Sequence, residues 1–428
     1  MKVLILHNRY RQPGGEDTAA RREAAMLRQH GFDVVEHVVD NVVDNDASRS
    51  LSKVAGDVAL LARAPWSEDS YAAVRRMCQE FRPSIVHVHN FWMRLTPSVH
   101  SAAHSAGAAT VQSLHNYRLV CGNGFLLRDG KVCLDCVGTS LWRGVARRCY
   151  HDSVLASAAV ARMIAHNRSR ETWTRDVDAF ITPSEGAREI LLHAGMPSER
   201  FFVKPNFTED PGVGARAPST SRSFVFAGRF SEEKGLRVLI EAWARVQRTE
   251  GARLIVAGDG PERIELENYA LRLGLSASDL LFAGRVPSAK LIDLIKNARA
   301  VMLPSICLET FGSTIVEAFS CGRPAIVSDL GSPSELVRDG WNGFKVPPSD
   351  PAALTRAMEL LLANDQLADE LGRNGRYDYV TGFTPQINFK TLSGIYDFAL
   401  RHRRETMKAG ENLEHPAART IEEAACRV

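Results

Sequence analysis

Short apolar runs that end in a small or polar residue recur along this chain, and each is followed by a stretch with helical periodicity. Runs that are apolar on both faces are typical of strands covered by helices on both sides. Strands that alternate with helices favour parallel sheets joined by right-handed crossovers. The runs are VLILHN (3–8), IVHVHN (85–90), TVQSLHN (110–116), AFITPS (179–184), FVFAGR (224–229), LIVAGDG (254–260), LLFAGR (280–285), AVMLPS (300–305) and AIVSD (325–329). The sequence therefore predicts an α/β protein.

The runs form two series, separated by a stretch rich in glycine, proline and serine at 208–223, as expected of a linker or an exposed loop. A chain of 428 residues is also too long for one ordinary hydrophobic core. We therefore expect two doubly wound domains. Their expected bounds are 1–205 and 206–385, followed by a C-terminal helix at 386–403 that packs back on the N-terminal domain and by a flexible tail at 404–428.

The bulk properties narrow the class of protein. The net charge of +3 is too small to predict a nucleic acid partner. The chain has no apolar run long enough to cross a membrane, and its start, MKVLILHNRY, does not resemble a signal peptide. Eight cysteines in a chain of this length are not typical of a disulfide-rich secreted module. A cytoplasmic protein is the simplest interpretation.

Two glutamates, Glu309 and Glu317, enclose a Phe-Gly pair in the segment ETFGSTIVE. The preceding apolar run ends near Ser305, so we expect Glu309 on a loop at the carboxyl edge of the sheet, where such sheets bind ligands. The next helix is expected to begin at Gly312 or Ser313, which places Glu317 about one turn into it.

The start of this helix is a candidate anion site. Gly312 lets a ligand approach the backbone closely. The next three N–H groups, those of Ser313, Thr314 and Ile315, are expected to be unpaired and to suit a phosphate. The two carboxylates can then accept hydrogen bonds from hydroxyl groups on either side of that phosphate. The alternative is an ordinary capped helix with a solvated Glu309.

The segment FAGRFSEEKG holds two basic residues just after a strand that ends at Gly228. Arg229 offers a planar fork for phosphate oxygens, and Lys234 offers a compact point charge. Together they can neutralise a diphosphate leaving group. The alternative is a surface ion pair with one of the two glutamates between them.

Two other glycine motifs carry less information. Gly14 and Gly15 separate the first strand from a helix and permit a tight turn. The segment GDGPER begins like a dinucleotide-binding motif, but Arg263 stands where the third glycine is required. A helix that starts with proline after a glycine turn explains that segment.

The order of these motifs resembles that of the retaining glycosyltransferases of family 4, which have the GT-B fold. The shared elements are the glycine pair, LHNY, FAGRFSEEKG, VAGDGPE and ETFGSTIVEAFSCGRPAIVS, and the resemblance extends from about residue 2 to about residue 348. It implies two Rossmann-like domains that face each other across a cleft. It also implies transfer of a sugar from a nucleotide-diphosphate sugar to a glycan or lipid-linked glycan acceptor in cell-surface polysaccharide synthesis.

The resemblance implies roles for individual residues. Arg229 and Lys234 hold the diphosphate, Glu309 faces the hydroxyl groups of the donor sugar, and Glu317 takes the ribose hydroxyls. Gly15 gives its backbone N–H to the phosphate from the other domain. The implied nucleotide-sugar site comprises Gly15, Gly228, Arg229, Lys234, Glu309, Gly312, Ser313, Thr314, Ile315 and Glu317.

His115, in LHNY, matches the family's histidine near the donor sugar, and with Glu309, Arg229 and Lys234 it completes the implied catalytic set. Asn116 stands where family members usually carry aspartate, so it receives no role. His87 and His89 flank the end of a predicted strand nearby; a direct role and a place in the core both stay open.

No residue offers itself as a covalent nucleophile, which favours same-face substitution through an ion pair, and no pair of metal-binding carboxylates is evident. The implied catalysis therefore requires no cofactor. Two other functions stay open: a GT-B-like sugar-nucleotide epimerase and a non-catalytic nucleotide-sugar-binding partner subunit.

Four of the eight cysteines lie in one segment near 118–152 of the N-terminal domain: Cys121, Cys133, Cys136 and Cys149. Thiols with this clustering, including one C-x2-C pair, suit a structural zinc site that holds a loop with little core of its own. Reduced packing cysteines and a disulfide are the alternatives.

The segment from Leu141 to Arg175 contains seven arginines and two acidic residues, with apolar residues between them. The arginines are Arg143, Arg147, Arg148, Arg162, Arg168, Arg170 and Arg175. A solvated basic face and docking on an anionic membrane surface are both consistent with this pattern. The second interpretation predicts a peripheral protein on the inner face of the plasma membrane.

Overall fold

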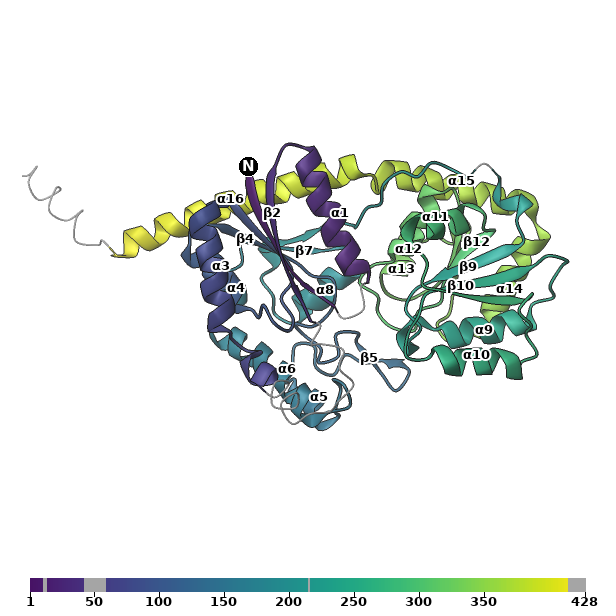
Figure 1. The fold of residues 1–428 in the computed structure, drawn as a ribbon, viewed down its shortest axis with the longest axis horizontal. Helices are drawn as coiled ribbons and strands as arrows, with labels where there is room; N and C mark the ends of the chain where they lie inside the picture. Colours follow the sequence, from purple (N-terminus) through teal and green to yellow (C-terminus); the bar gives the residue numbers. More distant parts are fainter. Residues whose placement is uncertain (11–13, 42–58, 215, 415–428) are drawn as a thin grey trace, which may run out of the picture.

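The structure is a computed structural model that describes residues 1–10, 14–41, 59–214 and 216–414. Two parallel six-stranded sheets, each flanked by helices, form the two halves of the molecule (Figure 1). The fold predicted from the alternating apolar runs is therefore confirmed. Among the described residues no helix is both long enough and apolar enough to cross a bilayer.

The N-terminal sheet has the strand order β2-β1-β3-β4-β7-β8. Its strands are β1 (Lys2–Arg9), β2 (Asp33–Asp40), β3 (Ile85–Asn90), β4 (Ala109–Ser113), β7 (Ala179–Thr182) and β8 (Phe201–Val203). The main helices of this half are α1 (Gly15–Gln29), α3 (Glu68–Phe81), α4 (Ser98–Ser105), α6 (Val154–Ser169) and α8 (Glu185–His193), with the short α7 (Thr172–Arg175) and η1 (Ser198–Arg200).

The C-terminal sheet has the order β11-β10-β9-β12-β13-β14, which is the Rossmann order. Its strands are β9 (Ser223–Ala227), β10 (Arg253–Ala257), β11 (Leu280–Gly284), β12 (Ala300–Leu303), β13 (Ala325–Ser328) and β14 (Gly343–Val346). The helices are α9 (Leu236–Arg245), α10 (Arg263–Arg272), α11 (Ser288–Lys296), α12 (Ser313–Ser320), α13 (Gly331–Leu336), α14 (Pro351–Ala363) and α15 (Asp365–Gly382), with η2 (Pro218–Thr220) and η3 (Glu232–Lys234).

Every predicted apolar run contains a strand, but β2, β8 and β14 of the two six-stranded sheets were not predicted. The first of these is an edge strand whose residues are exposed or half-buried throughout, with charged residues interleaved. Another edge strand, β8, is only three residues long. Edge strands lose one neighbour, so their sequences need not be apolar on both faces.

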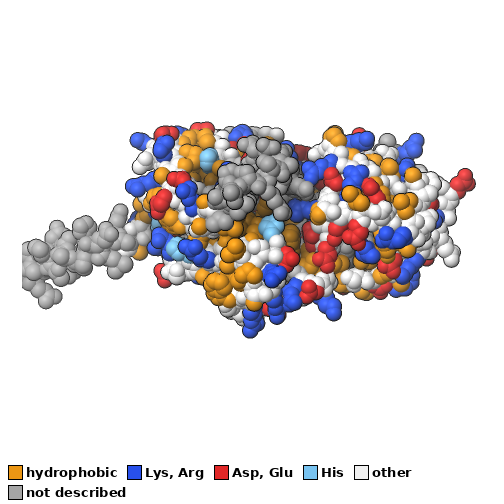
Figure 2. Space-filling model, turned by 60° about the horizontal axis from the view of Figure 1, so that its bottom comes forward, with side chains coloured by type: hydrophobic (Ala, Val, Ile, Leu, Met, Phe, Trp, Pro, Cys, Tyr) orange, Lys and Arg blue, Asp and Glu red, His pale blue; other side chains and the backbone are white. Residues whose placement is uncertain are grey.

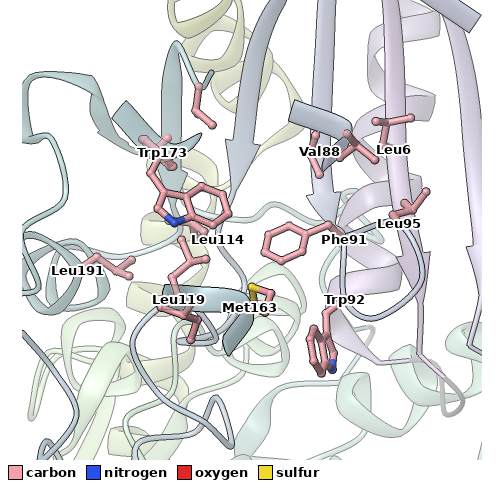
Figure 3. Close-up of a cluster of buried hydrophobic side chains, with 14 of the residues drawn as sticks. Leu6, Val88, Phe91, Trp92, Leu95, Leu114, Leu119, Met163, Trp173 and Leu191 are labelled. Atoms are coloured by element: carbon pink, nitrogen blue, oxygen red, sulfur yellow. The ribbon is translucent and has the colours of Figure 1, made fainter. Parts of the chain in front are cut away.

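The N-terminal core extends from the sheet into the segments that follow it. Figure 3 shows Leu6 and Val88 of the sheet in one buried cluster with Leu119, Met163 and Trp173. Although the segment after β4 contains little regular structure, its Leu119 is buried in the N-terminal core, which fixes the start of the segment against the sheet.

The last helix, α16 (Pro385–Glu414), leaves the C-terminal half and packs on the N-terminal sheet (Figure 1). Leu392, Ile395 and Ala399 are buried there with residues of β1, β3, β4 and β7. The predicted boundary between this helix and a flexible tail, at residue 404, is wrong, because the helix continues to Glu414. Arg403, the last residue of the predicted C-terminal helix, donates a hydrogen bond to the His104 carbonyl and so holds α16 onto α4. The remaining tail lies outside the described residues.

Candidate active site

The strand order of the C-terminal sheet reverses between β9 and β12, and the loops after these two strands form the candidate site. In doubly wound sheets a ligand binds at this reversal, outside the carboxyl ends of the strands. The backbone N–H of Ile306 donates to the Glu233 carbonyl at 3.0 Å, which ties the two loops together. Lys234 and Glu309, one from each loop, are thereby brought side by side.

Lys234 Nζ lies 2.7 Å from Glu309 Oε1, and the side chains are 24% and 13% exposed. Burial lowers the pKa of Lys234, but the Glu309 carboxylate outweighs it, so the pKa is raised above its usual value and the ammonium stays charged. Lys234 holds its position because Gly235 turns the chain with a φ of 65°. A Cβ on Gly235 would lie 1.9 Å from the Pro304 carbonyl oxygen, so no other residue fits.

Arg229 lies in the same loop and is half-buried. No carboxylate among the residues that the structure describes pairs with it, so the alternative of a surface ion pair with one of the neighbouring glutamates does not hold for Arg229. Gly228 precedes it at the end of β9, where its N–H donates to the Ala257 carbonyl at 3.1 Å. The loop therefore carries one cation paired with a carboxylate, Lys234, and one without a carboxylate partner among the described residues, Arg229.

The N-terminus of α12 faces the N-terminus of α1 from the other domain. Ser313 Oγ would lie 3.9 Å from a Cβ at Gly15, so the two helix starts approach each other. One prediction is wrong here: the N–H of Ile315 is not unpaired, because it donates to the Gly312 carbonyl at 2.8 Å. A tight first turn consumes this donor, which leaves those of Ser313 and Thr314 for an anion.

Gly312 also has a second reason to be glycine. A Cβ there would lie 2.7 Å from Ile315 Cδ1 and 3.2 Å from Leu303 Cδ2. The Thr314 hydroxyl donates to the Ala227 carbonyl at 3.3 Å, which fixes the first turn of α12 against the end of β9. The helix start is thus held rigidly beside the Lys234 loop.

Glu317 lies on α12 and forms an ion pair across the domains that sequence reasoning did not predict. Its Oε1 accepts a hydrogen bond from Arg22 Nη2 at 2.9 Å, and the side chains of Arg22 and Glu317 are 22% and 12% exposed. Arg22 lies on α1, and its Nη1 also donates to the Phe207 carbonyl at 3.3 Å. No sequence pattern indicated this pairing, because the partners belong to different domains.

His115 follows β4 and borders the site from the N-terminal half. Its backbone carbonyl accepts a hydrogen bond from Thr310 Oγ1 at 2.8 Å, which places it beside the Glu309 loop. Its Nε2 lies 3.1 Å from His89 Nδ1. Burial, and then the neighbouring His89, lower the pKa of His115 well below its usual value, so the imidazole is neutral at neutral pH.

His87 and His89 lie in a buried polar cluster behind His115. His87 Nδ1 and His89 Nε2 lie 2.9 and 3.2 Å from Glu23 Oε1. Lys204 Nζ lies 2.7 Å from the other oxygen of Glu23, and His87 contacts the Tyr396 hydroxyl of α16 at 2.8 Å. His87 is fully buried, so it is a core residue. His89 contacts the His115 ring on the side away from the candidate site.

Glu16 is a candidate site residue that sequence reasoning missed, although it directly follows Gly15. Its Oε2 accepts a hydrogen bond from Asn116 Nδ2 at 3.4 Å, and the same amide contacts the Tyr10 hydroxyl at 3.1 Å. Burial, with a smaller contribution from Asp17, raises the pKa of Glu16 to about 8. A protonated carboxyl group at the start of α1 can donate a hydrogen bond to a sugar hydroxyl.

Comparisons with known proteins agree with this geometry. Solved structures with the same fold include Anabaena HepE in complex with UDP, with a TM-score of 0.64 and 20% identity over 93% of this chain and 100% of that one. Sucrose-phosphate synthase from Thermosynechococcus elongatus aligns with a TM-score of 0.67 and 17% identity over 96% and 100% of the two chains. Fold and site together define a GT-B protein.

Two family profiles match the chain: "Glycosyl transferase 4-like domain" over residues 14–206 and "Glycosyl transferases group 1" over residues 214–378. The protein therefore belongs to the family 4 glycosyltransferases of the GT-B type.

Curated relatives match over part of their length. The D-rhamnosyltransferase of Pseudomonas aeruginosa is 35% identical over 165 residues, which are 38% of this chain and 42% of that protein. The phosphatidyl-myo-inositol mannosyltransferase of Mycobacterium leprae is 32% identical over 247 residues, or 56% and 59% of the two. In both cases the chain spans less than two-thirds of the relative's length.

Proposed function

We propose that the protein is a retaining glycosyltransferase that moves a sugar from a nucleotide-diphosphate donor to a glycan or lipid-linked glycan in cell-surface polysaccharide synthesis. The observation that carries the proposal is the Lys234–Glu309 pair beside the facing starts of α1 and α12. This arrangement supplies cations and N–H donors for a diphosphate next to a carboxylate for sugar hydroxyls.

The proposed chemistry follows from where charge develops. Cleavage of the anomeric bond leaves negative charge on the diphosphate and positive charge on the sugar ring. Lys234, Arg229 and the N–H groups of Ser313 and Thr314 stabilise the leaving group. The sugar is attacked on the face that the diphosphate leaves, and a leaving phosphate oxygen takes the proton of the acceptor hydroxyl. No covalent intermediate with the protein is required.

A donor panel tests the function. Because solved structures of this fold hold UDP and UDP-glucose, UDP sugars are the first donors to screen by thermal shift, followed by GDP and dTDP sugars. Product analysis with the donor that stabilises the protein then decides. A new anomerically retained glycoside supports the proposal, an epimerised donor supports the epimerase alternative, and binding without turnover supports a partner subunit.

The two glutamates are expected to contribute differently to binding. Glu317→Gln should weaken binding of the bare nucleoside diphosphate by about tenfold or more, since a hydrogen bond to a charged group contributes about 1.5–3 kcal/mol. Glu309→Gln should instead weaken binding of the intact donor more than that of the bare nucleotide. Calorimetry with both ligands measures this.

Glu370→Gln, an exposed change on α15, is the matched control for the loss of one carboxylate charge. Equal losses for both ligands in the two site variants would refute the proposed division between sugar and ribose.

A lipid-linked acceptor would lie at a membrane, and a surface near α5 (Trp142–Ala146) suits an anionic membrane. All seven arginines of the 141–175 segment are exposed. Trp142 and Leu155 beside them are 56% and 71% exposed. Figure 2 shows basic and apolar side chains side by side along the lower edge of the N-terminal half. Apolar anchors with cations around them are typical of interfacial binding.

Vesicle sedimentation tests this surface. Arg148→Glu with Arg162→Glu should weaken binding to phosphatidylglycerol vesicles roughly thirtyfold or more, at about 1 kcal/mol for each arginine lost. Arg147 is left unchanged because it pairs with Asp135. The matched control is the same double charge reversal at Arg356 and Arg373, exposed on the other domain. Equal sedimentation of both double variants would leave only a solvated basic face.

A further inference from the structure

The segment between β4 and α6 is long and has little regular structure. It contains a hairpin of two-residue strands, β5 (Leu127–Arg128) and β6 (Lys131–Val132), and the five-residue helix α5. Irregular segments of this length are uncommon in a compact domain unless they are functional or cross-linked. Even so, Val120 and Leu126 are buried, so the segment holds one conformation against the core.

The fold gathers the four cysteines of this segment around one cavity. Cys121 precedes the hairpin, Cys133 and Cys136 follow it directly, and Cys149 follows α5. All four line a cavity of about 20 Å³, and none forms a disulfide. A space of this size holds a single small occupant.

Two glycines keep the space between the cysteines open. A Cβ at Gly144 would lie 3.7 Å from Cys136 Sγ and 3.8 Å from Cys149 Sγ. A Cβ at Gly122 would lie 3.8 Å from Cys149 Cβ. A side chain at Gly144 would therefore contact two of the four sulfurs directly.

We propose that Cys121, Cys133, Cys136 and Cys149 bind one zinc ion as a closed tetrahedral thiolate site. Four sulfur ligands and no open position are the pattern of a structural zinc site. Each thiol gives up its proton to solvent on binding, so the zinc and four thiolates together carry a charge of about −2. Arg128 and Arg147 line the same cavity, although each also pairs with an aspartate, Asp129 and Asp135.

The metal-free side chains need a small adjustment. No three of the four sulfurs lie within 4.8 Å of one another in the described structure. The Cys121 thiol instead donates to Asn123 Oδ1 at 3.0 Å. We expect the thiols to reorient by rotation about χ1 when the ion binds.

Another group of potential ligands does not compete for this role. Glu23, His87 and His89 do place ligand atoms within 4.8 Å of one another. However, the Lys204 ammonium already lies 2.7 Å from Glu23, and its charge repels a second cation.

The zinc site would fix a hairpin that reaches the candidate active site. The turn between β5 and β6 extends toward the C-terminal half (Figure 1), where a Cβ at Gly130 would lie 3.6 Å from Glu232 Oε1. Glu232 begins η3, the turn that ends in Lys234. The ion would thereby hold the hairpin against the loop that carries the diphosphate lysine, a role that rests on the proposed function.

Metal analysis of the full-length protein, purified with reductant and without chelator, tests the site. We expect about one zinc per chain, and a fall in Tm when a strong chelator removes it, because the binding energy of such a site is folding energy. Cobalt substituted for zinc should show the intense absorption of tetrahedral cobalt thiolates. Cys133→Ser and Cys136→Ser should lose the metal, whereas Cys78→Ala, a buried cysteine on α3, should retain it.

The proposal would be overturned if the unmutated protein contained no metal, or if mass spectrometry showed a disulfide among these four cysteines. Both measurements use the unmutated protein, so they decide the question even where a serine variant fails to fold. The hairpin role is tested separately by nucleotide binding. Chelator-treated protein should bind the nucleoside diphosphate more weakly, and an unchanged affinity after zinc removal would refute the link. Zinc at one per chain without any sugar transfer would refute the proposed function and leave the metal site standing.

Discussion

Replacing Lys234 with alanine is expected to lower the rate of sugar transfer by about a hundredfold or more, the scale for losing one preorganised group that stabilises developing charge. Lys234 is held beside Glu309 at 2.7 Å and keeps its positive charge there. Arg229→Ala should cause a loss of similar size. The proposed mechanism has both cations act on the leaving diphosphate as its charge develops. The loss should therefore fall on kcat, which initial rates at saturating donor measure.

Lys290→Ala is the matched control, since Lys290 is exposed on α11 and makes no ion pair within the described parts of the chain. Its rate should equal that of the wild type. Wild-type kcat in both the Lys234 and the Arg229 variants would show that the diphosphate lies elsewhere.

Replacing Lys204 with methionine is expected to lower the free energy of unfolding by about 3–5 kcal/mol, the cost of removing one partner of a buried ion pair. Lys204 and Glu23 are 2.7 Å apart, and each side chain is 4% exposed. Burial raises the pKa of Glu23, but Lys204 and then His87 and His89 lower it well below its usual value. Without Lys204 the carboxylate is left buried among uncharged groups. Denaturant unfolding measures the loss.

The stability loss in Lys204→Met is also expected to depend on pH, in a direction set by the lowered pKa of Glu23. A carboxyl group with a depressed folded pKa stabilises the protein above its unfolded pKa, and this contribution is lost as the pH falls through the folded pKa. The difference between wild type and Lys204→Met should therefore be largest near neutral pH and shrink in acid.

Two controls separate the buried charge from general damage. Glu23→Gln combined with Lys204→Met should destabilise less than Lys204→Met alone, because no unpaired charge remains. Arg63→Met, which breaks an ion pair with Asp69 in which both side chains are more than half exposed, should cost at most about 1 kcal/mol. Full stability of Lys204→Met at pH 7 would contradict the role assigned to this pair.

Sequence reasoning located the residues whose positions follow from local rules. Lys234 and Glu309 were predictable because each follows a central apolar strand, and the carboxyl ends of parallel strands meet at one edge. Their direct contact was not predicted, because it depends on the backbone hydrogen bond between Ile306 and Glu233 that joins the two loops. The unpaired Ile315 N–H was predicted wrongly because the first turn of α12 is tighter than an α-helical turn.

Contacts between the domains lay beyond such reasoning. Arg22 and Glu317 are separated by 295 residues, and neither lies in a pattern that indicates the other. The pKa of Glu16 is raised mainly by its burial, which depends on the packing of α1 against the loop after β4, and no local pattern indicates that burial.

Periodicity and motif spacing are local properties of a chain, so they were enough to predict the two parallel sheets, the loops that carry the candidate site and the family to which the protein belongs. Which charged side chains pair with one another depends instead on how the distant parts of the chain pack. The tertiary structure paired Glu317 with Arg22, placed Lys204 against Glu23 and gathered four cysteines around one cavity. Such contacts join distant segments whose separation is fixed by how the sheets and helices pack, and no local pattern records that distance.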